Sequence, residues 1–154
     1  QTEPTVILDG AHNPDKMRAA SESLAYTSSR VIGIIGMKFG KDVQETLIHA
    51  LPTMDAVIVT EFKLQGLWQA VSADSLASTI HELTPNLPIT VEPDVTAAIE
   101  LGLGMAGSAD IIWITGSLYL IGNARQFWHP NKKIIEEAEL PTVAARPVGN
   151  SFLT

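Results

Sequence analysis

The chain has 154 residues and a formal net charge of −7, and 45% of its residues are hydrophobic. This length and composition suit one folded domain and exclude a disordered chain, and the negative charge argues against a surface that binds nucleic-acid phosphates. Cysteine is absent, which excludes disulfides and thiolate metal sites and fits a reducing compartment, so we expect a cytoplasmic protein.

The sequence predicts neither a membrane span nor a signal peptide. No apolar run approaches the roughly 18 residues of a membrane span, so we expect no membrane partner. The opening residues QTEP lack the basic start and apolar middle of a signal peptide, and there is no initiating Met. We therefore interpret the chain as a fragment of something longer.

The first half of the chain alternates short apolar runs with helical patterns. The run at 5–8 predicts a strand, and Asn13 as N-cap with Pro14 at the first helical position predicts a helix over 14–26. The run VIGII at 31–35 is apolar throughout, which is typical of a parallel strand covered on both faces. A helix over 43–51 follows, with Asp42 as its predicted cap.

The same alternation continues in the second half. Strands are predicted at 56–59, 89–91 and 111–115, and a loop at 62–70. The predicted helices cover 73–83, 95–105 and 118–127, and their caps are Ser72, Asp94 and the Gly116-Ser117 pair. A weaker helical pattern follows at 130–139, and residues 140–154 have the composition of a flexible tail.

This order of elements predicts an α/β fold. We expect a Rossmann-like three-layer sandwich, with a mostly parallel sheet of about five or six strands and helices on both faces, as one domain over 1–139. Ligands of such sheets bind beyond the carboxyl ends of the strands.

Three strand-to-helix junctions at 9–13, 36–42 and 115–117 are therefore expected at one edge of the sheet. Asp9 accepts hydrogen bonds, so it suits the hydroxyl groups of a ribose. His12 can donate to a phosphate or carboxylate, Lys41 adds a positive charge, and Gly116-Ser117 offers close backbone approach and a hydroxyl. Together these features indicate a nucleotide or another small anionic ligand.

Each residue also has a purely structural interpretation. Asp9 and His12 are equally well explained as residues that stabilise a turn. Lys41 is explained as a solvated surface charge, and Ser117 as an ordinary N-cap. Only their convergence at one edge favours a site.

Other motifs are weaker. The sequence GLGMAG at 102–107 follows a helical pattern and precedes a strand, which is the reverse of the dinucleotide-binding context. The four histidines have no metal-ligand spacing, so no metal site is expected in this chain.

Three segments resemble a known family. LDGAHNP at 8–14 resembles the D-x-A-H-N-P motif that opens the C-terminal domain of folylpolyglutamate synthase and dihydrofolate synthase, members of the Mur ligase superfamily. The stretch at 36–42 resembles the family's G-M-x-x-x-K-D segment, and TGSLYLIG at 115–122 resembles T-G-S-L-Y-L-V-G. The resemblance covers residues 5–125.

The resemblance implies a role for each site residue. Asp9, His12 and Asn13 would bind ATP, with Asp9 on the ribose. His12 would also lie near the incoming L-glutamate and act in catalysis, and Ser117 and Lys41 would bind glutamate. The implied reaction is ATP-dependent addition of glutamate to a folate through an acyl phosphate.

The implied partners lie outside this chain. The resemblance implies an N-terminal domain and a central P-loop domain that holds Mg²⁺ and most of the folate site, in a monomeric parent protein. We expect this chain alone to be inactive. Two alternatives stay open: the C-terminal domain of a peptidoglycan Mur-type amino-acid ligase, and a stand-alone nucleotide-binding or docking module.

Overall fold

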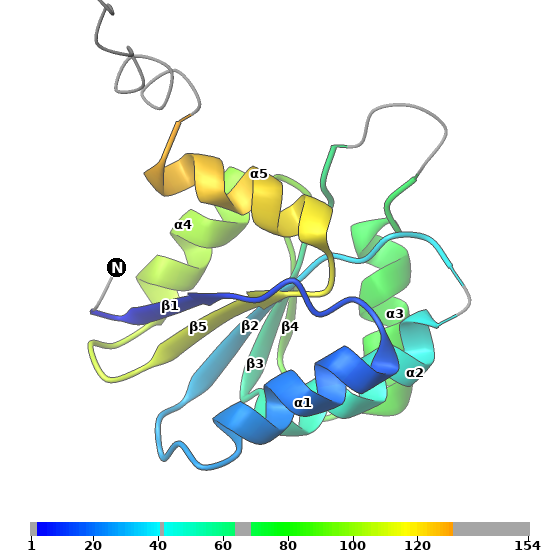
Figure 1. Cartoon of the computed structure of the whole chain (residues 1–154), viewed down its shortest axis with the longest axis horizontal. Coiled ribbons are helices and arrows are strands. Elements are labelled where there is room, and N and C mark those ends of the chain that lie inside the picture. Colours follow the sequence, from blue (N-terminus) through cyan, green and yellow to red (C-terminus); the bar gives the residue numbers. More distant parts are fainter. Residues whose placement is uncertain (1–2, 41, 64–68, 131–154) are drawn as a thin grey trace, which may run out of the picture.

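The computed structural model describes residues 3–40, 42–63 and 69–130, where strands and helices alternate (Figure 1). The strands are β1 (Thr5–Leu8), β2 (Val31–Ile35), β3 (Ala56–Val59), β4 (Ile89–Val91) and β5 (Ile111–Thr115). The helices are α1 (Pro14–Leu24), α2 (Val43–Ala50), α3 (Ala73–Leu83), α4 (Val95–Met105) and α5 (Leu118–Trp128), with a 3₁₀ turn η1 (Leu51–Thr53). All five strands have the predicted bounds.

The helix ends differ from the sequence prediction by one or two residues. Helix α1 ends at Leu24 instead of residue 26, and α5 extends to Trp128. Helix α2 ends at Ala50 and continues as the 3₁₀ turn, which contains Pro52. Proline cannot donate the next backbone hydrogen bond of an α-helix, so the chain tightens there.

The five strands form one parallel sheet in the order β1-β5-β2-β3-β4. The predicted α/β class with a mostly parallel sheet is confirmed. The last strand, β5, lies between the first two and pairs with both of them. This crossover places the loops after β1, β5 and β2 side by side at the carboxyl edge.

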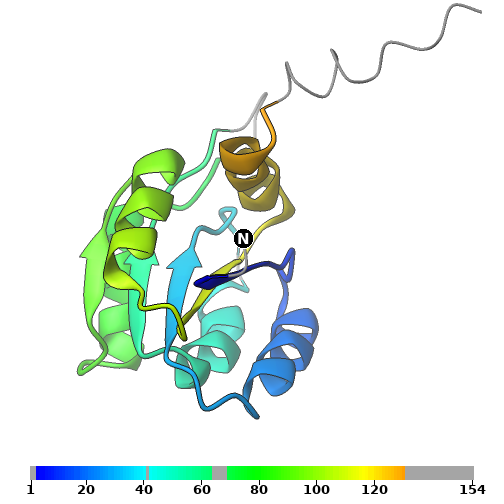
Figure 2. The same cartoon turned by 90° about the vertical axis from the view of Figure 1, so that its left-hand side faces the viewer.

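The sheet is covered on both faces, which produces the three predicted layers (Figure 2). Helices α1, α2 and α3 pack on one face, over a core that includes Val31, Ile35 and Trp113. Helices α4 and α5 pack on the other face, over Ile32 and Ile34. The alternation along β2 follows from the two-residue repeat of a strand, and it explains why the whole run had to be apolar.

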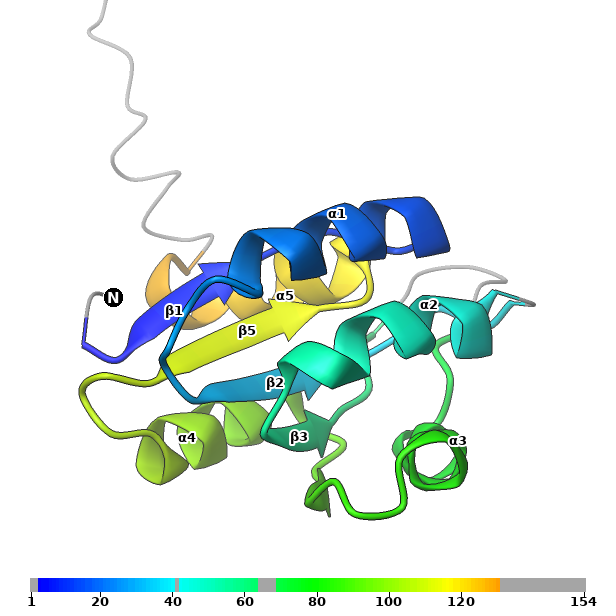
Figure 3. The same cartoon turned by 90° about the horizontal axis from the view of Figure 1, so that it is seen from below.

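Helices α1 and α2 run side by side on their face of the sheet (Figure 3). The buried hydroxyl of Ser21 donates a hydrogen bond of 2.7 Å to the backbone carbonyl of His49, which ties the two helices together. This contact lies in the C-terminal halves of the two helices and fixes them relative to one another there.

Four of the five predicted helix caps are confirmed, and one is wrong. The side chains of the confirmed caps accept first-turn N–H groups of α1, α3, α4 and α5, and the residues are Asn13, Ser72, Asp94 and Ser117. Asp42 precedes α2 but makes no such hydrogen bond. Its φ of −97° and ψ of 9° depart from the extended conformation that directs a cap side chain toward the first turn.

Several predicted features lie outside the described residues: Lys41, most of the loop at 62–70, the helical pattern at 130–139 and the tail at 140–154. The domain boundary at residue 139 stays a prediction. The GLGMAG segment ends α4, as its sequence context predicted. In the part of the chain that the structure describes, no helix has the length and apolar character needed to cross a bilayer.

Candidate ligand site at the carboxyl edge of the sheet

Backbone hydrogen bonds hold the three junctions together. The N–H of Asp9 donates to the carbonyl of Ile114 over 3.0 Å, and the N–H of Gly116 donates to the carbonyl of Ala11 over 3.1 Å. The N–H of Gly36 donates to the carbonyl of Thr115 over 3.4 Å. The loops after β1, β5 and β2 therefore form one connected rim whose shape is set by the main chain.

Gly116 is required at the centre of this rim. Its φ is +110°, a conformation that residues with a Cβ rarely adopt. A Cβ built there would lie 2.7 Å from the carbonyl oxygen of Gly36, in the neighbouring junction. The close approach of the junctions after β5 and β2 thus depends on a glycine.

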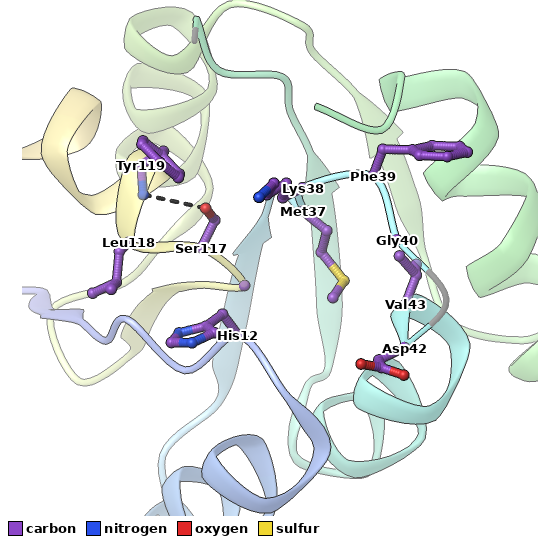
Figure 4. Close-up of a pocket in the computed structure, with 11 residues that line it drawn as sticks. His12, Met37, Lys38, Phe39, Gly40, Asp42, Val43, Ser117, Leu118 and Tyr119 are labelled. Carbon is purple, nitrogen blue, oxygen red and sulfur yellow. Dashed lines mark hydrogen bonds between the residues drawn. The ribbon is translucent and has the colours of Figure 1, made fainter. Parts of the chain in front are cut away.

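One hollow of about 360 Å³ opens between the junctions after β1, β2 and β5 (Figure 4). We call it the Ser117 hollow. Its lining residues are His12, Met37, Lys38, Phe39, Gly40, Asp42, Val43, Gly116, Ser117, Leu118 and Tyr119.

Ser117 is placed to cap its helix and to meet a ligand. Its side-chain oxygen accepts the N–H of Tyr119 over 3.2 Å, so the structural interpretation of this residue holds. The hydroxyl hydrogen has no acceptor among the described residues, and although Ser117 is only 2% exposed, it lines the hollow. The hydroxyl can therefore donate to a ligand oxygen while the cap remains intact.

Lys38 is the lysine that the structure places in the Ser117 hollow. It follows β2 and forms an antiparallel bridge with Ala70, and it is partly buried. Sequence reasoning assigned the site charge to Lys41, which lies outside the described residues, and gave Lys38 no role. Lys38 stands in the same junction, but the sequence alone does not show that it lines a hollow.

A second hollow, of about 410 Å³, lies on the other side of the loop after β1. We call it the Asp9 hollow. It is lined by Asp9, Gly10, Ala11, His12, Lys16, Ala19, Ala20, Ser23 and Leu118. One carboxylate oxygen of Asp9 accepts the N–H of Ala11 over 2.8 Å, which builds the turn. The carboxylate retains lone pairs that can accept hydrogen bonds from hydroxyl groups of a ligand.

His12 lines both hollows, as does Leu118. Its Nδ1 lies 2.8 Å from the carbonyl oxygen of Gly10. Because a carbonyl only accepts, Nδ1 carries the hydrogen, and in the neutral ring Nε2 has the free lone pair. The ammonium of Lys16 lies 3.4 Å from this Nε2.

Asn13, the remaining predicted ATP-binding residue, is engaged as the cap of α1. Its side-chain oxygen accepts the N–H of Lys16 over 3.0 Å. The two amide hydrogens of its side chain stay available as donors. In the described ranges, no group of three or more His, Asp or Glu residues is arranged to hold a metal ion.

The fold and the site indicate the class of protein. A parallel α/β domain with hydroxyl-accepting, donating and cationic groups at its carboxyl edge is typical of domains that bind small polar ligands. The chain belongs to the family of the Mur ligase, glutamate ligase domain, which its residues 1–118 match.

Two relatives show the range of this family. The chain is 31% identical over 127 residues to a protein of Halobacterium salinarum named a probable bifunctional folylpolyglutamate synthase/dihydropteroate synthase. That match covers 82% of this chain and 15% of the relative. A UDP-N-acetylmuramoyl-L-alanyl-D-glutamate–2,6-diaminopimelate ligase of Xylella fastidiosa is 32% identical over 119 residues, 74% of this chain and 23% of that protein.

Solved structures match the same region. Folylpolyglutamate synthase of Mycobacterium tuberculosis, complexed with ADP and AMPPCP, superposes with a TM-score of 0.73 and 25% identity over 84% of this chain and 30% of that one. A bifunctional folylpolyglutamate synthase/dihydrofolate synthase with Mn, AMPPNP and L-glutamate bound gives a TM-score of 0.69 with the same identity and coverage. The chain thus spans less than a third of the length of each of these four proteins.

Proposed function

We propose that this chain is the C-terminal domain of an ATP-dependent ligase that adds L-glutamate to a folate. The observation that carries the proposal is that His12 lines both the Asp9 hollow and the Ser117 hollow. A ligase of this kind must bring a nucleotide and an amino acid together at one reacting centre, and two hollows that share a lining residue suit that requirement.

In the proposed reaction, ATP phosphorylates the terminal carboxylate of the folate, which yields ADP and an acyl phosphate. The neutral amine of glutamate then attacks the acyl carbon and loses a proton to solvent, an amide bond forms, the bond from carbon to the phosphate oxygen breaks, and inorganic phosphate leaves. Apart from the attacking amine, the reacting groups are anionic: the folate carboxylate, the ATP phosphates and the acyl phosphate. The protein therefore acts mainly by positioning them and by offsetting their charge.

We assign the nucleotide to the Asp9 hollow. The Asp9 carboxylate accepts hydrogen bonds from the ribose hydroxyls, and the amide of Asn13 donates toward the same ligand. His12 faces the phosphate end of the nucleotide and is the catalytic residue of this domain. The nucleotides in the related structures support a nucleotide as a ligand of this kind of protein.

We assign glutamate to the Ser117 hollow. The Ser117 hydroxyl donates to a glutamate carboxylate, His12 faces the amino acid from the other side, and Lys41 supplies positive charge. The L-glutamate bound to a related enzyme supports this choice of amino acid.

The divalent metal is proposed to bind mainly outside this chain. A related structure contains Mn, and Mg²⁺ would screen the charge of the ATP phosphates in this enzyme. On the family resemblance, we place the metal mainly on a central domain that this chain does not include. That domain and the folate are its partners, in a monomeric cytoplasmic parent enzyme.

The test is a ligation assay with the longer protein that carries these residues. We expect ADP release that requires both a reduced folate and L-glutamate, and a large loss of turnover with His12→Ala. The 154-residue chain alone should release no ADP. Folate- and glutamate-dependent turnover by this chain alone would contradict the proposed division of the site.

A peptidoglycan ligase is the second candidate, and the 32% identity to the diaminopimelate-adding enzyme favours it. The same assay with UDP-N-acetylmuramoyl-L-alanyl-D-glutamate and 2,6-diaminopimelate separates the two. Turnover with that pair and none with folate would replace the folate assignment.

A further inference from the structure

We infer that Lys16 is a further nucleotide-binding residue, which donates to a phosphoryl group held between its ammonium and His12. This inference rests on the proposed function and adds a residue to its nucleotide side. It is carried by the position of the Lys16 side chain in the Asp9 hollow.

Lys16 lines the Asp9 hollow, and its ammonium lies 3.4 Å from Nε2 of His12, four residues earlier in the chain. Since Nδ1 of His12 donates to the Gly10 carbonyl, the neutral ring presents a lone pair toward this ammonium. A contact of this length leaves most of the charge of Lys16 without compensation.

The neighbouring cation on the same helix behaves differently. Arg18 forms ion pairs with Asp15 at 3.8 Å and with Glu22 at 3.5 Å. In the described ranges Lys16 has no carboxylate within ion-pair distance, although the chain is strongly acidic. Lys16 also stands in the first turn of α1, where a positive charge is unfavourable to the helix. An anion bound beside Lys16 would offset this unfavourable interaction with the helix.

The chemistry of the hollow indicates which anion. A carboxylate, Asp9, lines the same space and repels a ligand that is anionic throughout. A ligand with neutral hydroxyls at one end and a phosphoryl group at the other satisfies both residues. A nucleoside phosphate has this composition, with its ribose toward Asp9 and a phosphoryl oxygen toward Lys16.

The test is nucleotide binding by the longer protein, measured by isothermal titration calorimetry with ADP, adenosine and inorganic phosphate. We expect Lys16→Met to weaken ADP binding about fivefold, a modest effect because the side chain is exposed, and to leave adenosine binding unchanged. Lys16→Arg, which keeps the charge, should restore most of the ADP affinity. Arg18→Met is the matched control on α1 and should bind ADP like the wild type.

The outcomes separate this inference from the proposed function. ADP affinity that is equal in Lys16→Met and wild type, in a protein that still ligates glutamate to folate, would overturn the inference alone. Equal losses for ADP and adenosine would also overturn it, because they indicate a distorted hollow. Weakened binding of inorganic phosphate with unchanged ADP affinity would overturn it as well, since Lys16 would then bind the released product. If Lys16→Met weakens ADP binding but the longer protein does not ligate glutamate to folate, the inference about Lys16 is supported and the proposed folate reaction is contradicted.

Discussion

The backbone N–H of Gly116 donates a hydrogen bond of 3.1 Å to the carbonyl oxygen of Ala11. These two residues are far apart in the sequence, and each is the immediate neighbour of a proposed ligand-binding residue, Ser117 and His12. The main chain therefore sets the separation between the two side chains, and a change in this contact should alter the site before it unfolds the domain.

Gly116→Ala should destabilise the protein and disturb the site. The positive φ costs roughly 1–3 kcal/mol for a residue with a Cβ, and the approach to the Gly36 carbonyl adds to it. The free energy of unfolding, from urea denaturation, measures the loss. Gly122→Ala is the control, because its Cβ would meet nothing within 4 Å on α5, and it should stabilise by about 0.5–1 kcal/mol. Equal stability of the two variants would contradict the requirement for glycine.

The Asp9→Asn variant distinguishes the role of Asp9 in the turn from its role in ligand binding. The asparagine oxygen can still accept the Ala11 N–H, so the unfolding midpoint should change little. The lost charge should raise KM for ATP about tenfold in the longer protein, since hydrogen bonds to charged groups contribute about 1.5 kcal/mol or more. Asp55→Asn is the matched control: Asp55 accepts the Val31 N–H at 2.7 Å at the opposite edge of the sheet, and its KM for ATP should match the wild type. An unchanged KM in Asp9→Asn would remove Asp9 from the ribose site.

Ser117→Ala should affect both helix capping and glutamate binding. Loss of the cap should lower the free energy of unfolding by about 1 kcal/mol, and loss of the hydroxyl donor should raise KM for glutamate. Ser72→Ala provides the comparison, because Ser72 caps α3 with the same side-chain chemistry and lines neither hollow. It should lose similar stability and keep its KM. If both variants keep the wild-type KM, Ser117 is a cap alone.

The ring of Tyr119 stacks on Phe62, with centroids 6.3 Å apart and an interplanar angle of 12°. Tyr119→Phe should keep this stacking and the stability, whereas Tyr119→Leu should cost about 0.5–1.5 kcal/mol. A double-mutant cycle with Phe62→Leu measures the coupling between the rings. Tyr26→Leu, at a ring that is 94% exposed, should change stability by less than about 0.5 kcal/mol. A coupling energy near zero would show that the rings are adjacent without mutual stabilisation.

Much of the fold could be predicted because its sequence signals are local. The runs at β2 and β3 are apolar at every position, and both strands are fully buried. The carboxyl-edge rule for parallel strands also predicted that the loops holding Asp9, His12 and Ser117 would meet. The order of the strands could not be predicted, because nothing in the composition of β5 shows which strands it pairs with.

The features that were missed depend on three-dimensional context. Asp42 has the residue type of a cap, but the backbone at that position turns its side chain away from the role. Lys16 and Lys38 look like ordinary surface charges in the sequence, and only the hollows show that they face the site. The roles of Asp9, His12, Asn13, Lys41 and Ser117 remain predictions for the experiments above.

The position of β5 between β1 and β2 has a consequence for how the chain acquires its structure. During synthesis β1 emerges before the other described strands, yet the partner with which it pairs begins only at Ile111. Until that late segment arrives, β1 has no neighbour in the sheet, and loop closure over such a separation slows folding. A chain that ends before Thr115 would lack the residues that join the loops of the rim. Ligand binding by chains of increasing length should therefore appear abruptly once β5 is complete, and should not increase gradually.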